Sequence, residues 1–107
     1  MVAQSPFVVV FDPLVRQHLR ANAPKYHSLI RDTIYKQLTY EPDVETRNRK
    51  PLEQPAAFGA RWELRFGPDN WFRVLYSVNR EELLVSVLAI GVKRGNKLMI
   101  GKEQVDL

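Results

Sequence analysis

The order of hydrophobic and polar positions predicts a strand that leads into two helices. "FVVVF" (7–11) is a short run of β-branched and aromatic residues, which is typical of a strand. Asp12 and Pro13 follow it, and this pair favours an N-cap and the first turn of a helix. Apolar side chains then recur at helical spacing on both sides of the interruption "NAP" (22–24). The chain from about 13 to 40 is therefore predicted to form an α-helical hairpin.

The second half of the chain changes to a period of two. "RWELRF" (61–66) has its aromatic and leucine side chains on one side and its charged side chains on the other, as in a half-covered strand. "WFRVLYSV" (71–78) and "LLVSVLAI" (83–90) are apolar on both faces, which indicates central strands. The turn sequences "GPDN" and "NREE" separate these runs, so we expect a three-stranded antiparallel meander. "KLMI" is a possible short strand after it.

Together these segments predict an α+β fold. Residues 41–60 carry prolines and mixed charge with little periodicity, so we expect a long loop there that can include a turn of extended chain. The expected order is β-α-α-β-β-β plus a short C-terminal strand or helix, with two N-terminal helices packed on one face of a mostly antiparallel sheet. A length of 107 residues fits one domain, 1–107.

Charge and composition narrow the choice of partners. The chain has 16 Lys and Arg against 12 Asp and Glu, a net charge of +4, which favours an anionic partner and above all nucleic acid. The lack of cysteine excludes a disulfide framework, a thiolate metal site and a cysteine nucleophile. The sequence starts without the pattern of a secretory signal and has no apolar run long enough for a membrane span, so we expect a cytoplasmic protein without membrane contact.

Four segments in order, "RNRKPL", "WELRFG", "FRVLYSV" and "VLAIGVKR", resemble the RelE/ParE superfamily of toxins from type II toxin-antitoxin pairs. The resemblance runs from about Phe7 to Glu103, and it is closest to RelE-like members. It implies a toxin that is neutralised by an antitoxin wrapped around it in a hetero-oligomer. RelE-like members enter the ribosome and cut messenger RNA without a metal or cofactor. The alternatives are a non-enzymatic ParE-like gyrase poison and an inactive relative that only binds its antitoxin.

Site residues follow from matching the family's pattern and from position on the expected strands. The family's two strand arginines match Arg65 and Arg73, and the cation after its last core strand matches Lys93 or Arg94. The expected catalytic residues are Arg65, Arg73, Lys93 and Glu63. The expected nucleic-acid-binding residues are Arg47, Arg49, Lys50, Arg61 and Arg94. In each case the competing interpretation is a solvated surface charge, with Arg65 and Arg73 paired to Glu63 or Asp69.

Metal-free RNA cleavage requires a group that takes the proton of the attacking 2′-hydroxyl, an acid for the leaving 5′-oxygen, and fixed cations for the added negative charge. Arginine suits the third task because its planar fork matches pairs of phosphate oxygens. Many ribonuclease members have a Tyr or His near the C-terminus, but this tail has neither. Proton transfer would then involve Lys93 or Glu63, or geometry that the ribosome supplies.

The sequence allows two registers between the strand of Arg65 and the strand of Arg73. A plain four-residue "GPDN" loop would put Arg65 across from Phe72, and Arg65 and Arg73 would point to opposite faces. A bulge or an odd-length loop, for which Gly67 is suited, would bring them to one face. Only the second arrangement gives a phosphate clamp.

Overall fold

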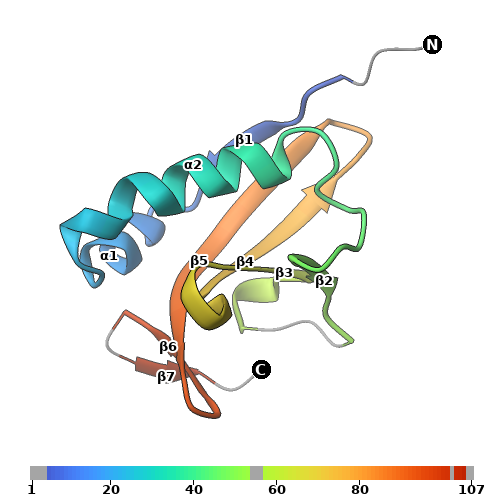
Figure 1. Ribbon diagram of the computed structural model, residues 1–107. Coiled ribbons are helices and arrows are strands. Elements are labelled where there is room, and N and C mark those ends of the chain that lie inside the picture. Colours follow the sequence, from blue (N-terminus) through green and yellow to red (C-terminus); the bar gives the residue numbers. More distant parts are fainter. Residues whose placement is uncertain (1–4, 54–56, 102, 106–107) are drawn as a thin grey trace.

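The computed structural model describes residues 5–53, 57–101 and 103–105, and it has an α+β fold in two layers (Figure 1). A seven-stranded sheet forms one layer, in the order β2-β3-β4-β5-β6-β7, with β1 paired to β5. β1 runs parallel to β5, and the other neighbours are antiparallel. The elements are β1 (Val8–Phe11), α1 (Val15–Arg20), α2 (His27–Leu38), β2 (Arg49–Pro51), β3 (Trp62–Phe66), β4 (Phe72–Asn79), β5 (Leu84–Arg94), β6 (Lys97–Ile100) and β7 (Glu103–Val105).

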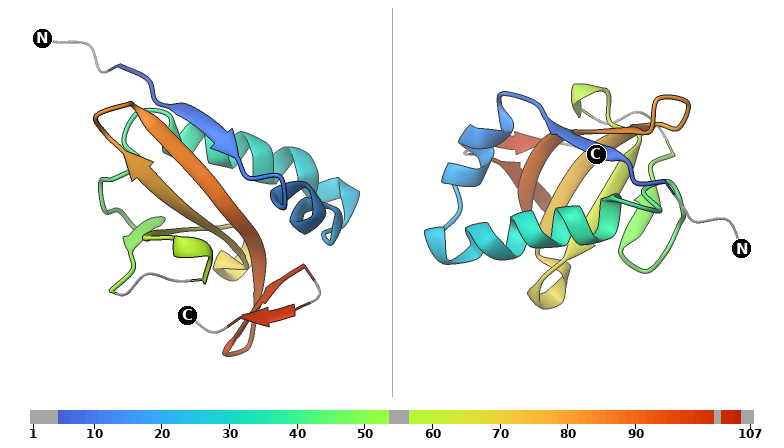
Figure 2. Two further views of the ribbon diagram at one scale, coloured as in Figure 1. Left: turned by 180° about the vertical axis from the view of Figure 1, so that it is seen from behind. Right: turned by 90° about the horizontal axis from the view of Figure 1, so that it is seen from above.

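The predicted helical hairpin is present and covers one face of the sheet (Figure 2). Ile30, Ile34 and Leu38 recur along α2 at helical spacing and are fully buried, because this stripe packs on the sheet. The Asp12 carboxylate accepts a hydrogen bond of 3.0 Å from the Leu14 N–H and so closes a turn just before α1, which begins at Val15 with no side-chain cap among the described residues. No helix in the described ranges is long and apolar enough to cross a membrane.

The sheet has two unlike faces. The face under the helices, called the helix face, carries the main core, which includes Leu64, Phe66 and Val74. The opposite face, called the outer face, carries a smaller apolar cluster around Leu75 and Ala89, and the segment before β3 covers part of it. Because directly opposed residues in neighbouring strands share a face, the strand register assigns each side chain to one of the two.

A bulge in β5 ties α1 to the sheet. Leu75 pairs with Ala89 whereas Tyr76 pairs with Val87, so β5 has one extra residue there. The backbone N–H of Ile90 then donates to Nδ1 of the buried His18 at 3.2 Å. His18 therefore satisfies a buried donor at the point where β5 changes its neighbour from β1 to β6.

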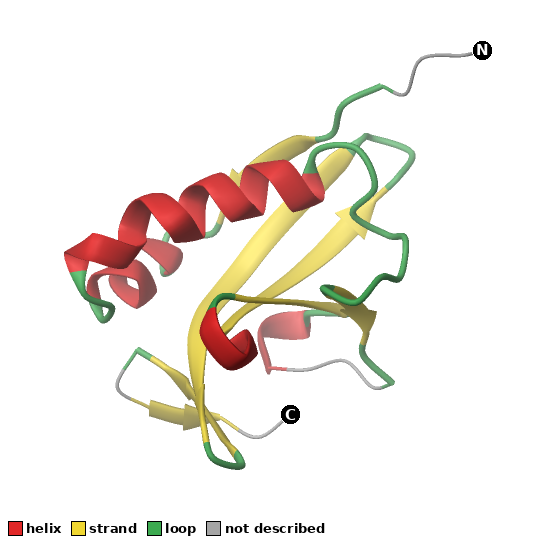
Figure 3. Ribbon diagram, viewed as in Figure 1, coloured by secondary structure: helices red, strands yellow, loops and turns green. Residues whose placement is uncertain are grey.

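The structure adds short elements to the expected order (Figure 3). The segment expected to be a long loop contains β2 and a 3-10 turn at Ala57–Gly59, and the end of the chain forms two strands, β6 and β7, in place of one strand or helix. β2 exists because it pairs with β3, and three residues are too few to reveal such pairing by periodicity. β5 also continues to Arg94, beyond the predicted end at 90.

Candidate functional site: a carboxylate-held arginine pair

Arg65 and Arg73 lie directly opposite each other on the outer face, since Phe66 pairs with Phe72 and Arg65 with Arg73. The connection therefore comprises residues 67–71, the odd-length alternative. Gly67, Asp69 and Asn70 have positive φ angles of 81°, 53° and 52°. Glycine adopts this region freely, and Asp and Asn adopt it more readily than other residues, which explains how the turn accommodates the extra residue.

A single buried carboxylate holds the two arginines together. Arg65 Nε donates to Glu63 Oε1 at 2.6 Å, and one terminal nitrogen of Arg73 donates to the same oxygen at 3.0 Å. Glu63 is 1% exposed, whereas the side chain of Arg65 is 38% exposed. The other oxygen, Oε2, is buried and has no hydrogen-bond partner in the described part of the chain. Oε2 is therefore an acceptor to which the described protein groups supply no donor.

Two asparagines that the sequence did not single out position these arginines. The backbone carbonyl of Asn70 accepts from Arg73 Nε at 2.9 Å. Asn48 and Arg65 bond reciprocally, since the Arg65 N–H donates to the Asn48 carbonyl at 2.7 Å and Asn48 Nδ2 donates to the Arg65 carbonyl at 2.8 Å. In the sequence, Asn48 and Asn70 are asparagines beside charged or turn residues. Such a pattern predicts a turn but not a contact with an arginine.

Three further predicted cations lie at separate points on or beside the outer face. Lys50 lies opposite Glu63 in the register, with its Nζ 3.5 Å from Glu45 Oε2. Lys93 is exposed on β5. It lies two residues after Gly91, and Gly91 is the residue that pairs with Arg73. Arg61 is exposed one residue before β3. The register thus places three predicted cations, Lys50, Arg65 and Arg73, around Glu63, whereas Lys93 lies farther along the outer face, beside the turn between β3 and β4.

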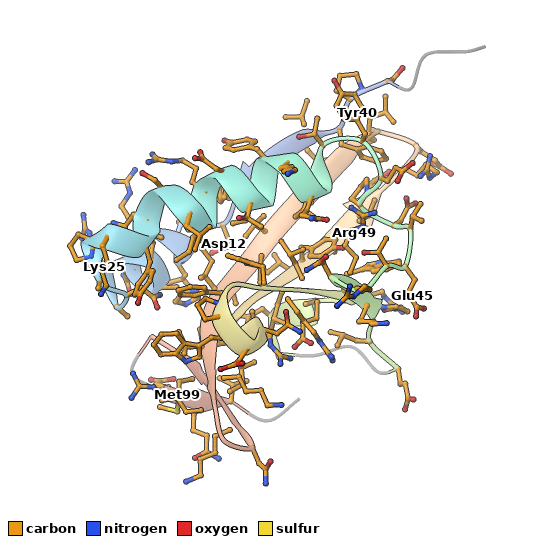
Figure 4. All side chains as sticks on the ribbon, viewed as in Figure 1. Asp12, Lys25, Tyr40, Glu45, Arg49 and Met99 are labelled. Atoms are coloured by element: carbon orange, nitrogen blue, oxygen red, sulfur yellow. The ribbon has the colours of Figure 1, made fainter. Side chains whose placement is uncertain are left out.

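Other predicted cations do not join this cluster. Arg49 pairs with Leu64, so it points to the helix face, where it donates to the Gln37 carbonyl at 2.8 Å and the Val44 carbonyl at 2.9 Å. Figure 4 labels it near the C-terminal end of α2. Arg94 shares the face of Val92, beside the end of α1, and Arg47 is exposed in the loop before β2. Arg49 therefore binds a carbonyl of the last turn of α2 and ties the loop at Val44 to it.

The buried Tyr and His side chains are engaged away from the cluster. Tyr76 donates to the Pro42 carbonyl at 2.6 Å on the helix face, and burial raises the pKa of its phenol, so it stays protonated at neutral pH. His18 accepts from Ile90, and burial lowers the pKa of its imidazole although Asp12 opposes this. No group of three or more His, Asp and Glu side chains suited to a metal occurs among the described residues.

Comparison with known proteins gives a likeness to a solved structure. No protein-family model and no curated protein matches the chain. A chain in the crystal structure of the toxin-antitoxin complex RelBE2 from Mycobacterium tuberculosis matches with a TM-score of 0.68. The match covers 85% of this chain and 95% of that chain, at 23% sequence identity. The two chains share a fold. This confirms the expected resemblance at the level of the fold.

Proposed function

We propose that this protein is the toxin of a toxin-antitoxin pair and that it cuts messenger RNA on the ribosome without a metal ion. The observation that carries the proposal is the arginine pair held by Glu63 on a sheet face that the helices leave uncovered. The shared fold with a chain of a toxin-antitoxin complex supports the first part. An antitoxin partner follows from the same likeness, and a complex of the two proteins is expected.

The electrostatics of the cluster suit a phosphate. Two guanidinium groups face one carboxylate, so one positive charge remains in excess. Arg65 is the better phosphate contact because its side chain is more exposed than that of Arg73, which is 9% exposed. When Arg65 turns from Glu63 to a phosphate oxygen, Glu63 Oε1 loses one of its two donors. Arg73 stays tied to the Asn70 carbonyl and keeps the site charged.

The proposed chemistry uses Glu63 and Lys93 for protons. Once Arg65 has turned to the phosphate and uncovered Oε1 of Glu63, that oxygen takes the proton of the 2′-hydroxyl, the 2′-oxygen attacks the phosphorus, and the bond to the 5′-oxygen breaks. Lys93 gives a proton to the leaving 5′-oxygen, so the products are a 2′,3′-cyclic phosphate and a 5′-hydroxyl. Arg65 and Arg73 stabilise the negative charge that develops on the phosphate oxygens. Lys50 and Arg61 bind neighbouring phosphates on the same margin.

The first experiment compares protein and DNA synthesis after tightly controlled expression without a partner. We expect incorporation of labelled amino acid to stop before that of labelled thymidine. Arg65→Ala should lower the cleavage rate on translated messenger RNA by about 10²–10³-fold, the usual effect of removing one charge-stabilising donor. Arg31→Ala is the matched control, because Arg31 is an exposed arginine on α2. If DNA synthesis stops first, a gyrase poison replaces the ribonuclease.

The ends of the cleaved RNA test the proton path separately. We expect the cleaved RNA to end in a 2′,3′-cyclic phosphate. We also expect cleavage to be lost when the nucleotide before the cut lacks its 2′-hydroxyl. Glu63→Gln and Lys93→Met should each slow cleavage. Undiminished cutting by both variants would remove these two residues from the proton path and leave the arginine pair in place. If neither synthesis stops in the cell, the chain is a relative that only binds its antitoxin.

A further inference from the structure

The outer edge of β1 is unpaired and apolar. Among the described residues β1 pairs only with β5, so its other side has no strand beside it. Val8 and Val10 lie on the outer face of this edge strand, and their side chains are 63% and 46% exposed. Edge strands are normally protected by charged side chains, proline or a bulge, but residues 7–11 contain none of these. An exposed edge of this kind favours pairing with another strand.

The backbone of β1 offers hydrogen-bonding groups on this edge. The N–H groups of Val8 and Asp12 donate to the Leu83 and Val87 carbonyls, at 2.8 and 2.9 Å, so even-numbered residues bond toward β5. Odd-numbered residues therefore point their backbone groups the other way. The Phe7 N–H does so but already donates to the Thr39 carbonyl at 2.6 Å, so the chain after α2 occupies the edge at Phe7 and the free edge begins beyond it. Val9 is the central residue whose N–H and carbonyl face outward.

The sequence of the edge reads the same in both directions, as Phe-Val-Val-Val-Phe (7–11). We propose that two copies of this protein pair through β1, antiparallel, about a two-fold axis at Val9. Val9 then exchanges both backbone hydrogen bonds with its own counterpart, and Val8 lies opposite Val10 of the second copy. The two exposed valines of one copy meet those of the other on the outer face, where cross-strand pairs of β-branched residues are favourable.

The surroundings of β1 support a self-complementary contact. Exposed aromatic side chains flank the same edge on the helix side, because Tyr35 packs against Phe11 with a ring separation of 5.9 Å and Tyr40 follows Thr39. Figure 4 labels Tyr40 beside the start of β1. The strand is uncharged, so two chains of net charge +4 can approach there without placing like charges opposite each other. The proposal does not depend on the function of the arginine cluster.

The mass of the purified full-length chain in solution tests this pairing. We expect sedimentation to show a species of twice the monomer mass of 12.5 kDa at high concentration, which dissociates on dilution. Val8→Lys and Val10→Lys should each give a monomer, because a cation on the edge opposes strand pairing. Val44→Lys should still form the dimer, since Val44 is similarly exposed, at 43%, but lies in the loop before β2. A monomer at the highest soluble concentration would overturn the proposal.

Disulfide formation tests the register independently of affinity. The chain has no cysteine, so single substitutions report only the intended contact. A residue pair without hydrogen bonds in an antiparallel ladder has its Cα atoms about 4.5 Å apart, within the range of a disulfide. Mixing Val8→Cys with Val10→Cys should give the mixed cross-linked dimer faster than either variant gives its own dimer. Equal rates for all three combinations would contradict a two-fold at Val9, as would a dimer that Val10→Lys leaves intact.

Discussion

Arg49 and the pair Arg65–Arg73 show two ways in which the same residue type is held inside one small fold. Arg49 lies on the helix face and donates to carbonyl oxygens, including Gln37 Oε1 at 3.0 Å, while the exposed Glu41 carboxylate lies 3.7 Å from its guanidinium. Arg65 and Arg73 lie on the outer face and donate to one oxygen of Glu63, whose second oxygen has no donor in the described structure. The first arrangement satisfies its acceptors, and the second leaves one unsatisfied.

This difference separates a structural cation from a candidate functional one. A guanidinium bound to backbone carbonyls has no reason to leave, because each carbonyl would then lack a donor. A guanidinium bound to a carboxylate can exchange that anion for a phosphate of similar geometry. Burial alone does not distinguish the two, since Arg49 and Arg73 are both 7% exposed. What differs is the carboxylate, which is exposed and 3.7 Å away for Arg49 but buried and hydrogen-bonded for Arg73.

The largest expected effect comes from removing the carboxylate. Glu63→Leu leaves Arg73 buried and opposite Arg65 without a counter-charge, so we expect a loss of about 3–5 kcal/mol in the free energy of unfolding. Glu63→Gln should lose less, because its amide oxygen still accepts from both arginines. Urea unfolding of the two variants measures the difference. Equal stability of Glu63→Leu and wild type would mean that the arginines do not depend on Glu63.

Arg49→Met should cost less and should leave the outer face unchanged. It removes the hydrogen bonds to Gln37 and Val44, and two partly buried carbonyls lose their donor, which we expect to lower the free energy of unfolding by about 2–3 kcal/mol. Arg49→Lys should recover only part, because one ammonium does not reproduce the fork. Measured below the unfolding transition, cleavage by Arg49→Met should equal wild type. If Arg49→Met loses as much cleavage activity as Arg65→Ala, Arg49 is not a purely structural residue.

Mild acid tests a third site, the buried imidazole of His18 at the junction of α1 and β5. His18 has a pKa lowered from the usual 6.5 by burial, so the unfolded chain binds this proton first as pH falls. Stability from His18 is therefore complete above about pH 6.5 and declines below it until the folded pKa is reached. His18→Asn keeps an acceptor for the Ile90 N–H without titrating. Unfolding at pH 7.5 and 5.5 should show a smaller pH dependence in this variant than in wild type.

Much of the fold was predictable because its helices and long strands carry their own periodicity. The stripe Ile30, Ile34 and Leu38 and the alternation in β3 were visible in the sequence, and both form as expected. β2 and β7 were not predictable, since strands of three residues depend on partners elsewhere in the chain. The charged side of β3 also differs from a solvated surface, because Glu63 is buried between two arginines.

The site was only half predictable for a related reason. The resemblance to the toxin family selected Arg65 and Arg73, but their meeting depends on the odd number of residues in the connection, which "GPDN" alone did not determine. Arg49 and Lys50 are neighbours in sequence and similar in charge, and strand alternation sends them to opposite faces. That assignment needs the register of β2 against β3, which local sequence does not contain.

Lys50→Ala gives the smallest effect on stability and is the closest control for Arg49, because the two residues are adjacent on β2. Lys50 pairs with the exposed Glu45 at 3.5 Å, and an exposed pair contributes about 0–1 kcal/mol. Its role on the outer face should appear in salt dependence: loss of one phosphate contact should weaken RNA binding and reduce the slope against salt concentration by about one. Arg49→Met should leave that slope unchanged, because its guanidinium is bound on the helix face. If Arg49→Met changes the slope and Lys50→Ala does not, the assignment of faces to phosphate binding is reversed.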